Sequence, residues 1–440
     1  MKNLNSLHFL NPLKRNSLFK LLYILPKKFI LVIIQLIRNK RLFKICKKFL
    51  SFSFPSTLFL KITNHMDIVS SVAFSPCNNI IAIASYDKTI SLYGINPLYK
   101  QTFKKQILCI KRHKDYIRSI RFSPCGNYLA SCGEDRHVIF HYTGNLYIKN
   151  IKNISNQTNT SSTSKSSLFG KKLLVLKDHK FCINSICFSN NNKYFVSGGD
   201  DGRAILYVIK CDSLDINNYN ATNINISLSI VKVFSNHGIG VFSVDFSSDS
   251  SLLAVGDMDG FATIYSISEN ILKIDDKIQK SNIIEETSLI KTKTKETKPT
   301  KETDIVFLKF KTHGEVYKVI FSLSGDYLAI STFLSQIYVY GINKNNTNSF
   351  NKEIFRVGNL DETNINIINF SFSPNEDYIV VGKSNSKVTV YKINNTNSKW
   401  LIEEVKELSY HDRAVFSVRI SPDGNYFATG SSDNSAIIYC

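Results

Sequence analysis

The chain has 440 residues, of which 43% are hydrophobic and 12% aromatic, which is enough apolar material for a sizeable core. A formal net charge of +20 is typical of proteins that bind nucleic acid, but here the charge is not spread evenly along the chain. Twelve of the excess positive charges lie in residues 1–57, which contain no Asp or Glu. The nine cysteines are odd in number and lack C-x-x-C spacing, which argues against a disulfide framework and a zinc site and indicates reduced thiols.

Residues 1–57 form a basic, apolar leader that we expect to lie outside the folded domain. Its longest apolar run, residues 29–37, is too short for a membrane-spanning helix, which needs about 20 residues. Three interpretations stay open. The leader is an organelle-import or signal-like segment, a segment that lies on an anionic membrane surface, or a start of the chain without a role. Membrane contact is therefore expected only through residues 1–57.

From residue 58 onwards, seven copies of one pattern follow each other. Each copy has an apolar strand, a turn rich in Pro, Gly and Asn, a second strand such as residues 128–131, and a third strand such as residues 89–93. The first strands end at Phe74, Phe122, Phe188, Phe246, Phe321, Phe372 and Ile420. Short strands separated by turn signals at this spacing predict an all-β repeat array.

A fourth strand precedes each later repeat, at residues 107–110, 173–176, 230–234, 305–310, 354–357 and 405–408. The chain stops at Cys440, where a third strand ends, so the last repeat lacks a fourth strand of its own. Residues 58–62, which precede the first repeat, can supply it. We therefore predict a closed ring of seven four-stranded blades, because closure leaves no open sheet edge to aggregate.

Polar insertions interrupt the array at about 143–169, 211–228, 266–304 and 342–353. They are rich in Asn, Ser, Thr, Lys or Glu and cannot bury enough apolar surface to fold, so we expect solvated loops. Each insertion follows a third strand and precedes a fourth, so all should leave the same face of the ring. The domain prediction is a single folded unit over 58–440 with these loops.

This pattern resembles the WD-repeat (tryptophan-aspartate) β-propeller family. The resemblance covers residues 58–440 and implies a single seven-bladed β-propeller, closed by an N-terminal strand. In the family, a His, a second-strand Ser or Thr, a turn Asp and a third-strand Trp form a hydrogen-bonded set within each blade. Three repeats keep the polar members by position: His113, Ser131 and Asp135; His179, Ser197 and Asp201; His411, Thr429 and Asp433.

The other repeats depart from the family set. Repeats one and four pair His65 with Asp87 and His237 with Asp259, but have Ile83 and Val255 where the second-strand hydroxyl belongs. Repeat five has His313 with Leu334 at the Asp place, and repeat six lacks the His and offers Asn385. The Trp place holds Tyr93, His141, Tyr207, Tyr265, Tyr340, Tyr391 and Tyr439. Tyr packs as a flat aromatic and donates from its hydroxyl, so Tyr207 and Tyr439 complete two of the sets in a divergent family member.

The repeated His, Ser and Asp places predict structural support rather than catalysis. An active site is needed once, whereas support is needed in every blade. His8 and His137 have no second ligand at metal-binding spacing, and the chain has no Gly-rich phosphate loop. We therefore expect no catalytic residue, no metal and no cofactor.

Two rim positions that the family uses for partner peptides supply the candidate binding residues. They hold an apolar arc in repeats four to seven, together with two further residues in repeats one and two: Phe242, Met258, Tyr317, Phe333, Ile368 and Phe416; Tyr86 and Arg118. Exposed aromatic residues at such density mark protein-binding surfaces. The alternative is that the same side chains line a narrow channel that they fill themselves.

The sequence thus favours a non-catalytic interaction scaffold that nucleates a multiprotein complex through the rim of the propeller. We expect other proteins or peptides as partners, a monomeric propeller within a hetero-complex, and a cytoplasmic or nuclear location, with organelle or membrane association through the leader left open. The alternative is a component of a nuclear or nucleolar ribonucleoprotein, supported by basic residues at 104–105, 111–114, 118 and 121. Nucleic acid is not the favoured partner, because such charges are more often solvated loop residues.

Overall fold

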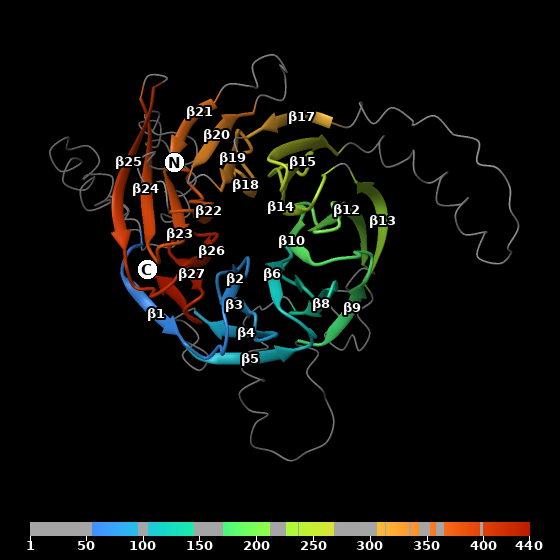
Figure 1. The fold of residues 1–440 in the computed structure, drawn as a ribbon. Helices are drawn as coiled ribbons and strands as arrows, with labels where there is room; N and C mark the ends of the chain where they lie inside the picture. The colour runs from blue at the N-terminus through green and yellow to red at the C-terminus, as the bar shows by residue number, and fades with distance from the viewer. Residues whose placement is uncertain are drawn as a thin grey trace, which may run out of the picture. The chain divides into compact units, whose positions relative to one another are not determined.

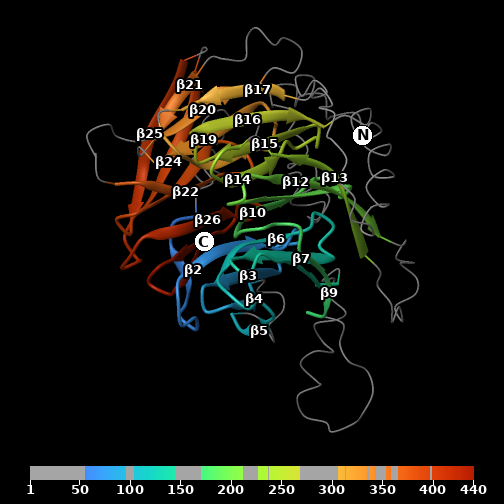
Figure 2. The same cartoon turned by 45° about the vertical axis from the view of Figure 1, so that its right-hand side comes forward.

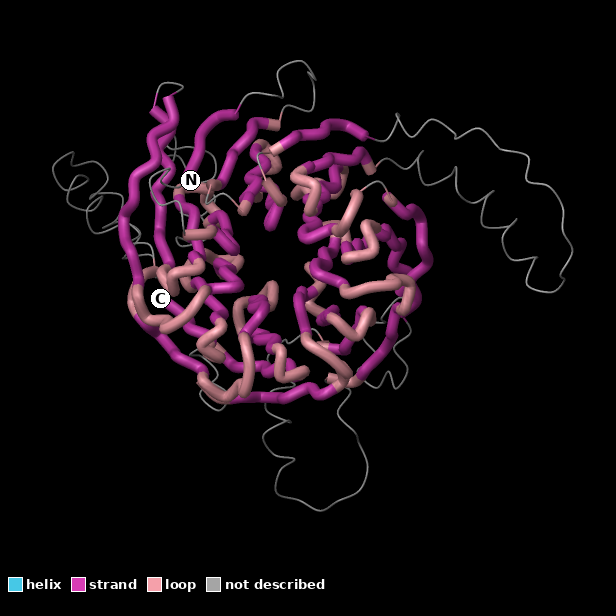
Figure 3. Tube along the Cα trace, in the orientation of Figure 1, coloured by secondary structure: helices cyan, strands magenta, loops and turns pink. Residues whose placement is uncertain are grey.

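The computed structural model describes residues 55–95, 104–144, 170–211, 226–235, 237–267, 306–312, 314–333, 336–342, 353–357, 365–396 and 399–440. Within these ranges the regular structure consists of β-strands without a helix, arranged as seven four-stranded antiparallel sheets around one axis (Figures 1 and 3). The predicted all-β, seven-bladed propeller is confirmed.

Each sheet is one blade, with its strands ordered from the axis outwards (Figure 1). The innermost strands are β2 (Val69–Phe74), β6 (Ile117–Phe122), β10 (Ile183–Phe188), β14 (Val241–Phe246), β18 (Val316–Phe321), β22 (Ile367–Phe372) and β26 (Val415–Ile420). The second strands are β3 (Ile80–Ser85), β7 (Tyr128–Gly133), β11 (Tyr194–Gly199), β15 (Leu252–Asp257), β19 (Tyr327–Thr332), β23 (Tyr378–Lys383) and β27 (Phe427–Ser431).

The third strands are β4 (Thr89–Gly94), β8 (Val138–Tyr142), β12 (Ala204–Cys211), β16 (Phe261–Ser266), β20 (Ile337–Gly341), β24 (Val388–Thr396) and β28 (Ala436–Tyr439). The outermost strands are β5 (Gln106–Lys111), β9 (Lys172–Leu176), β13 (Ile226–Phe234), β17 (Val306–Lys311), β21 (Glu353–Val357), β25 (Lys399–Leu408) and, for the seventh blade, β1 (Leu58–Ile62).

The burial of each strand follows its place in the blade. All six residues of β3 are buried, and their sequence is an almost continuous run of Ile and Ala. The outer strand β5 of the same blade buries only Ile110 fully and exposes its two ends. Strands covered on both faces become continuously apolar, whereas a strand with one solvated face keeps polar residues, which explains the gradient.

The ring closes as the sequence predicts. Strand β1 pairs antiparallel with β28, with Leu60 opposite Ile438 and Ile62 opposite Ala436. The backbone N–H groups of Ser56 and Thr57 both donate to the carbonyl of Cys440, at 3.1 Å each. The first strand of the ring and the last residue of the chain are therefore joined, and the edge that β28 would otherwise expose is covered.

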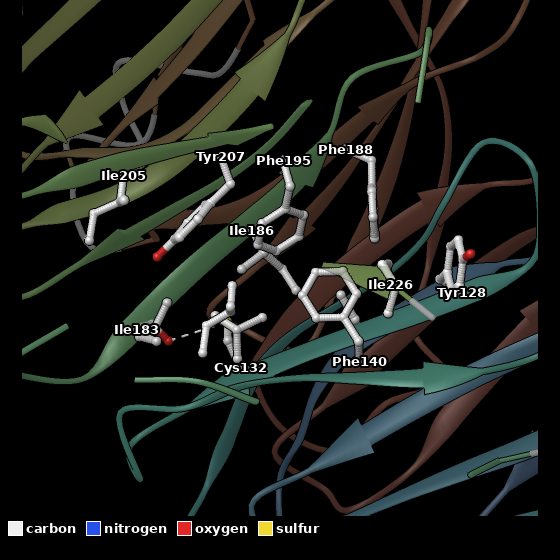
Figure 4. Close-up of a cluster of buried hydrophobic side chains, with 13 residues drawn as sticks. Tyr128, Cys132, Phe140, Ile183, Ile186, Phe188, Phe195, Ile205, Tyr207 and Ile226 are labelled. Carbon is white, nitrogen blue, oxygen red and sulfur yellow. Dashed lines mark hydrogen bonds between the residues drawn. The ribbon is translucent and has the colours of Figure 1, made fainter. Parts of the chain in front are cut away.

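The hydrophobic core lies between neighbouring blades. In the cluster between the second and third blades, Phe140 of β8 packs against Phe188 and Phe195, with ring centroids 5.8 and 5.0 Å apart (Figure 4). Tyr207 and Cys132 lie in the same cluster, which combines side chains of both blades. Aromatic rings bury about 150–250 Å² each, so contacts of this kind hold each blade to the next.

Two outer hairpins are longer than the sequence patterns predict. Strand β25 begins at Lys399 rather than residue 405 and pairs with β24 as far out as Thr396 opposite Lys399, an extension visible in Figure 2. Strand β13 begins at Ile226, inside the predicted 211–228 insertion. The extension of β25 in blade six includes Trp400, the single Trp of the chain, whose ring lies 5.3 Å from Tyr327 and 5.4 Å from Phe355 of blade five.

The leader up to residue 54 and most of each predicted insertion lie outside the described residues.

Candidate functional site

The antiparallel order of each blade divides its loops between two faces of the ring. The loop that leads into the innermost strand and the turn between the second and third strands lie at one face, here called the upper face. The turn between the first and second strands and the connection from the third to the fourth lie at the lower face. All candidate binding residues fall at the upper face, and the described residues that flank the four predicted insertions lie at the lower face.

Three blades carry a complete set of His, hydroxyl and Asp beneath the upper face. His113 lies with its Nδ1 2.9 Å from Asp135 Oδ2 and its Nε2 2.7 Å from Ser131 Oγ. The sets of His179 with Asp201 and Ser197, and of His411 with Asp433 and Thr429, repeat these contacts at 2.7–2.9 Å. Each His therefore ties the loop before its blade to the second strand and the following turn.

The Asp of each set also accepts a backbone hydrogen bond from the residue after the His, as Lys114 N–H donates to Asp135 Oδ2 at 3.0 Å. Burial by itself raises the pKa of Asp135. The hydrogen bond and charge of His113 outweigh that effect and lower the pKa to about 2. The side chain of His113 has no exposed surface, so the set supports the blade and offers no access to a substrate.

Part of the predicted apolar arc forms one aromatic surface. The ring of Tyr317 lies 5.4 Å from Phe242 and 5.8 Å from Phe333, which is 46% exposed. Met258, Ile368 and Phe416 are half-buried at the same rim positions. Phe416 makes no ring contact with the other three within the described ranges. Whether the arc binds a partner stays a prediction.

The two remaining candidates lie together in blades one and two. The guanidinium of Arg118 donates from Nε to Glu134 Oε1 at 3.1 Å and lies 5.8 Å from the ring centre of Tyr86. Tyr86 in turn stacks on Tyr116, with centroids 4.7 Å apart. Arg118 and Glu134 are thus an ion pair that fixes the rim, rather than two separate charges open to a partner.

A model of the family described as WD domain, G-beta repeat, matches residues 56–94, 104–141, 170–207, 228–266 and 402–440. These matches coincide with repeats whose blades are described above. The chain belongs to the WD-repeat family. WD-repeat proteins generally act as protein-interaction scaffolds and are typically non-catalytic. No curated protein matches this chain.

The WD-repeat blades outside these matches are the fifth and sixth, where the His and Asp set is incomplete. His313 and Leu334 of repeat five lie outside the described residues. In blade six, Asn385 occupies the Asp place and its Oδ1 accepts a local hydrogen bond from Lys387 N–H at 3.3 Å. Trp400, which joins blades five and six at the outer edge, supplies part of the attachment between them.

In blade four the sequence prediction is wrong about the acid. His237 Nδ1 lies 3.1 Å from Asp257 Oδ2 rather than bonding to Asp259. Asp257 is the last residue of β15 and is buried beside the His, whereas Asp259 lies in the turn beyond it. The missing hydroxyl is also replaced, because Tyr265 at the Trp place brings its hydroxyl 2.9 Å from His237 Nε2.

Other blades lack such a replacement. In blade one His65 Nδ1 lies 2.8 Å from Asp87 Oδ2, but no described residue bonds to its buried Nε2. In blade two the Trp place holds His141, which is fully buried, and no described residue forms a hydrogen bond with either of its ring nitrogens. Burial lowers the pKa of His141 to about 3, and the charges of His113 and Arg112 act in the same direction.

Tyr207 and Tyr439 complete the aromatic places of blades three and seven. The hydroxyl of Tyr207 donates to Asp178 Oδ2 at 3.1 Å, so it bonds to the loop before the blade. Tyr439 stacks on Phe427 with centroids 4.2 Å apart and is fully buried. Both side chains pack as the family Trp would, with burial raising the pKa of each phenol.

A second set of fasteners, which the sequence patterns did not identify, joins the innermost strands of successive blades. In four blades a serine at the third position of the strand accepts a backbone N–H from the next blade. The pairs are Ser71 with Ile120, Ser185 with Val244, Ser243 with Val319, and Ser417 with Val72, at 3.1–3.2 Å. The signal in the sequence is a serine flanked by β-branched residues, Val-x-Ser-Val or Ile-x-Ser-Ile, at the start of the first strand.

The most exposed apolar residues of the upper face also escaped the sequence prediction. They lie one or two positions after the His of repeats one, three and four, in the loops that lead into β2, β10 and β14. Met66 is 90% exposed, Ile239 69% and Phe181 58%. The aromatic arc is more buried than these loop tips, since only Phe333 of the arc is an exposed residue.

The basic residues of repeat two do not form one surface. Lys104 lies at the lower end of β5, where its amine contacts the Phe59 ring, and Arg112 is exposed at the upper end of the same strand. His113 is buried, Arg118 is paired with Glu134, and Arg121 belongs to the innermost strand β6. A nucleic-acid surface requires its cations on one face, so this division weakens the ribonucleoprotein alternative.

The described part of the chain contains no helix long and apolar enough to cross a membrane. It also contains no group of three or more His, Cys, Asp or Glu placed to bind a metal ion.

Proposed function

We propose that this WD-repeat protein is a non-catalytic scaffold that holds another protein on its upper face and so nucleates a multiprotein complex. The observation that carries the proposal is the set of exposed apolar side chains on this face, at the loop tips of blades one, three and four and at Phe333 of the aromatic arc in blade five. Met66, Phe181, Ile239 and Phe333 range from 46% to 90% exposed. Side chains of this size are normally buried, and a cluster of them on one face indicates a protein partner.

The energetics favour a polypeptide partner. Covering one Phe, Met or Ile side chain contributes about 1.5–3 kcal/mol to binding, so the four exposed side chains together can contribute several kcal/mol. The loops that carry Met66, Phe181 and Ile239 are held by a His and Asp pair beneath, as Met66 N–H donates to Asp87 Oδ2 at 3.1 Å. Loops fixed in this way lose little conformational entropy on binding, which leaves more of the contact energy as affinity.

The contacts beneath the surface support a non-catalytic role. The histidines of the complete sets have side chains that are 0–1% exposed, and the same geometry recurs in three blades. A reacting group has to reach its substrate, and these groups reach only their own blade. The proposed function is therefore binding. We further propose a monomeric propeller that is one member of a hetero-complex in the cytoplasm or nucleus.

A matched pair of surface variants tests the proposal. Phe181→Asp changes an upper-face side chain, and Leu323→Asp changes a lower-face side chain between β18 and β19; both side chains are 58% exposed. Quantitative affinity purification of the full chain should lose its partner with Phe181→Asp, and more fully when Ile239→Asp is added. The partner should be retained with Leu323→Asp. Equal retention by both variants refutes the upper face as the binding surface.

The aromatic arc is tested separately, through Phe242 and Phe416, which are not among the exposed loop tips. Phe242→Ala combined with Phe416→Ala should leave the fold intact and release the same partner. Retention of the partner by this variant removes the arc from the interface without affecting the loop tips. The ribonucleoprotein alternative is tested by ultraviolet crosslinking of the full chain, and absence of crosslinked RNA refutes it.

A further inference from the structure

The outermost strand of blade six, β25, has a sheet edge that the upper-face function does not use. Strand β25 has ten residues, whereas β1, β5, β9, β17 and β21 have five or six, and only β13, with nine, approaches this length. It pairs with β24 on one side, and no described strand pairs with its other side (Figures 1 and 2). The outward N–H and C=O groups of such an edge are a template for a further strand.

Two large apolar side chains of β25 are more exposed than any other on the described outer strands. Leu401 is 55% exposed and Val405 51%, against 43% for Leu58 of β1, which comes next. Trp400 and Ile402 pack against the core between blades five and six. Successive side chains of a strand point to opposite faces, so Leu401, between these two, points away from that core. Leu401 and Val405 are therefore apolar surface that the described part of the propeller does not cover.

The charges of β25 also differ from those of the other outer strands. In β1, β5, β9, β13 and β17 every charged residue is a lysine, which is a common protection of an edge strand against pairing with another chain. Strand β25 has three glutamates and two lysines. Glu407 is paired with Lys387 at 2.7 Å, and the amine of Lys406 donates to the backbone of residue 56 at 3.2 Å. Glu403 and Glu404 are exposed and have no ion-pair partner among the described residues.

We propose that the outer edge of β25 binds an extended, basic segment of another protein, which adds to blade six as a fifth strand. Main-chain hydrogen bonds along the edge supply affinity in this mode of binding, and the alternating side chains supply specificity. Apolar side chains of the segment cover Leu401 and Val405. Lysine or arginine side chains of the segment lie opposite Glu403 and Glu404, and opposite charges across two strands are stabilising.

A second copy of this chain fits the edge less well than a basic segment does. Antiparallel pairing of two β25 strands about their centres would place Glu403 of each copy opposite Glu404 of the other. Like charges directly opposite each other are destabilising. The edge also shares no residue with the upper-face binding surface, so the present proposal and the proposed function can fail independently.

The first test uses the full chain and two capped peptides of the same length as β25, one alternating lysine with valine and the other glutamate with valine. In fluorescence anisotropy, the lysine peptide should bind saturably and more weakly as salt is raised. The glutamate peptide should bind at least about tenfold more weakly. Hydrogen-exchange mass spectrometry should show slower exchange of β25 amides when the lysine peptide is bound, because a new strand protects them.

Surface variants locate the site. Glu403→Lys combined with Glu404→Lys should weaken binding of the lysine peptide by at least about tenfold. Val405→Lys should weaken it as well. Val306→Lys, at a 39% exposed position of the outer strand β17, is the matched control and should bind as wild type. All these side chains are exposed, so the variants should fold, which thermal denaturation checks.

Four results with the peptides overturn the proposal: no saturable binding of the lysine peptide by wild type, equal binding of the two peptides, binding without protection of β25 amides, or equal effects of Val405→Lys and Val306→Lys. Sedimentation of the wild-type chain tests the other occupant. A dimer that Val405→Lys dissociates would assign the edge to a second copy and overturn the proposal too.

Discussion

Acidification should destabilise this propeller through one buried side chain, His141 of blade two. The pKa of His141 is about 3 in the folded protein against 6.5 for the free side chain, mainly because burial disfavours the charged imidazolium. Between these two values the unfolded chain binds a proton that the folded chain does not. Stability is therefore unaffected by this group above pH 6.5 and is lost as pH falls below it, by about 1.4 kcal/mol per pH unit.

The expected loss is large on the scale of protein stability. From pH 6.5 to pH 5 it amounts to about 2 kcal/mol, against a total of about 5–15 kcal/mol for typical proteins. The pH range in which His141 affects stability is separate from the range in which the Asp partners of the blade histidines do so. The pKa of Asp135, for example, is lowered to about 2, so its contribution is complete above pH 4 and is lost only below it.

The assay is urea denaturation at pH 7, 6 and 5 for wild type, His141→Tyr and His141→Phe. Tyr is the residue at this place in the other six blades, and Phe controls for the added hydroxyl. The free-energy difference between wild type and variant should shift by about 2 kcal/mol between pH 7 and pH 5, in favour of the variant. Other histidines contribute equally to both chains and cancel. A difference that is constant with pH refutes the assignment to His141.

Three further predictions concern the fasteners and the closure of the ring. Tyr265→Phe should lower the unfolding free energy by about 1–3 kcal/mol, because it leaves His237 Nε2 buried without a partner. Tyr439→Phe should be nearly neutral, since no described residue bonds to the Tyr439 hydroxyl. Equal effects of the two variants in thermal denaturation would contradict this. Asp257→Ala should be more destabilising than Asp259→Ala by a similar amount, because only Asp257 bonds to His237; the reverse order would restore the sequence assignment. Ile62→Ala, in the closing strand, should cost about 2–4 kcal/mol against less than about 0.5 for its exposed neighbour Lys61→Ala, and an equal cost in urea denaturation would show that β1 does not close the ring.

The blade fasteners show where the sequence patterns were sufficient. His113 and Asp135 are 22 positions apart in the chain, as are His179 with Asp201 and His411 with Asp433. A fixed spacing between a loop and a turn of the same small sheet brings the same atoms together each time. Where one repeat changed its turn, as at Asp257, spacing alone selected the wrong acid, because burial and side-chain direction decide which carboxylate reaches the His.

The binding surface shows the opposite case. The rim positions were found from their register, but their exposure depends on what the neighbouring blades place beside them. Phe242 is half-buried against Tyr317 of the next blade, whereas Ile239, three residues earlier, projects from its loop into solvent. A pattern within one repeat contains no information about the packing partner in the next.

The sequence by itself determined the seven repeats, the four strands of each blade and the closing strand at 58–62. These are local properties, because the alternation of apolar residues and the turn residues fix each strand and each hairpin. The tertiary structure alone decided the serine fasteners between blades and the replacement of a missing hydroxyl by Tyr265. The fasteners join residues from different repeats, and Ser417 and Val72, which are 345 positions apart, meet only because the ring closes.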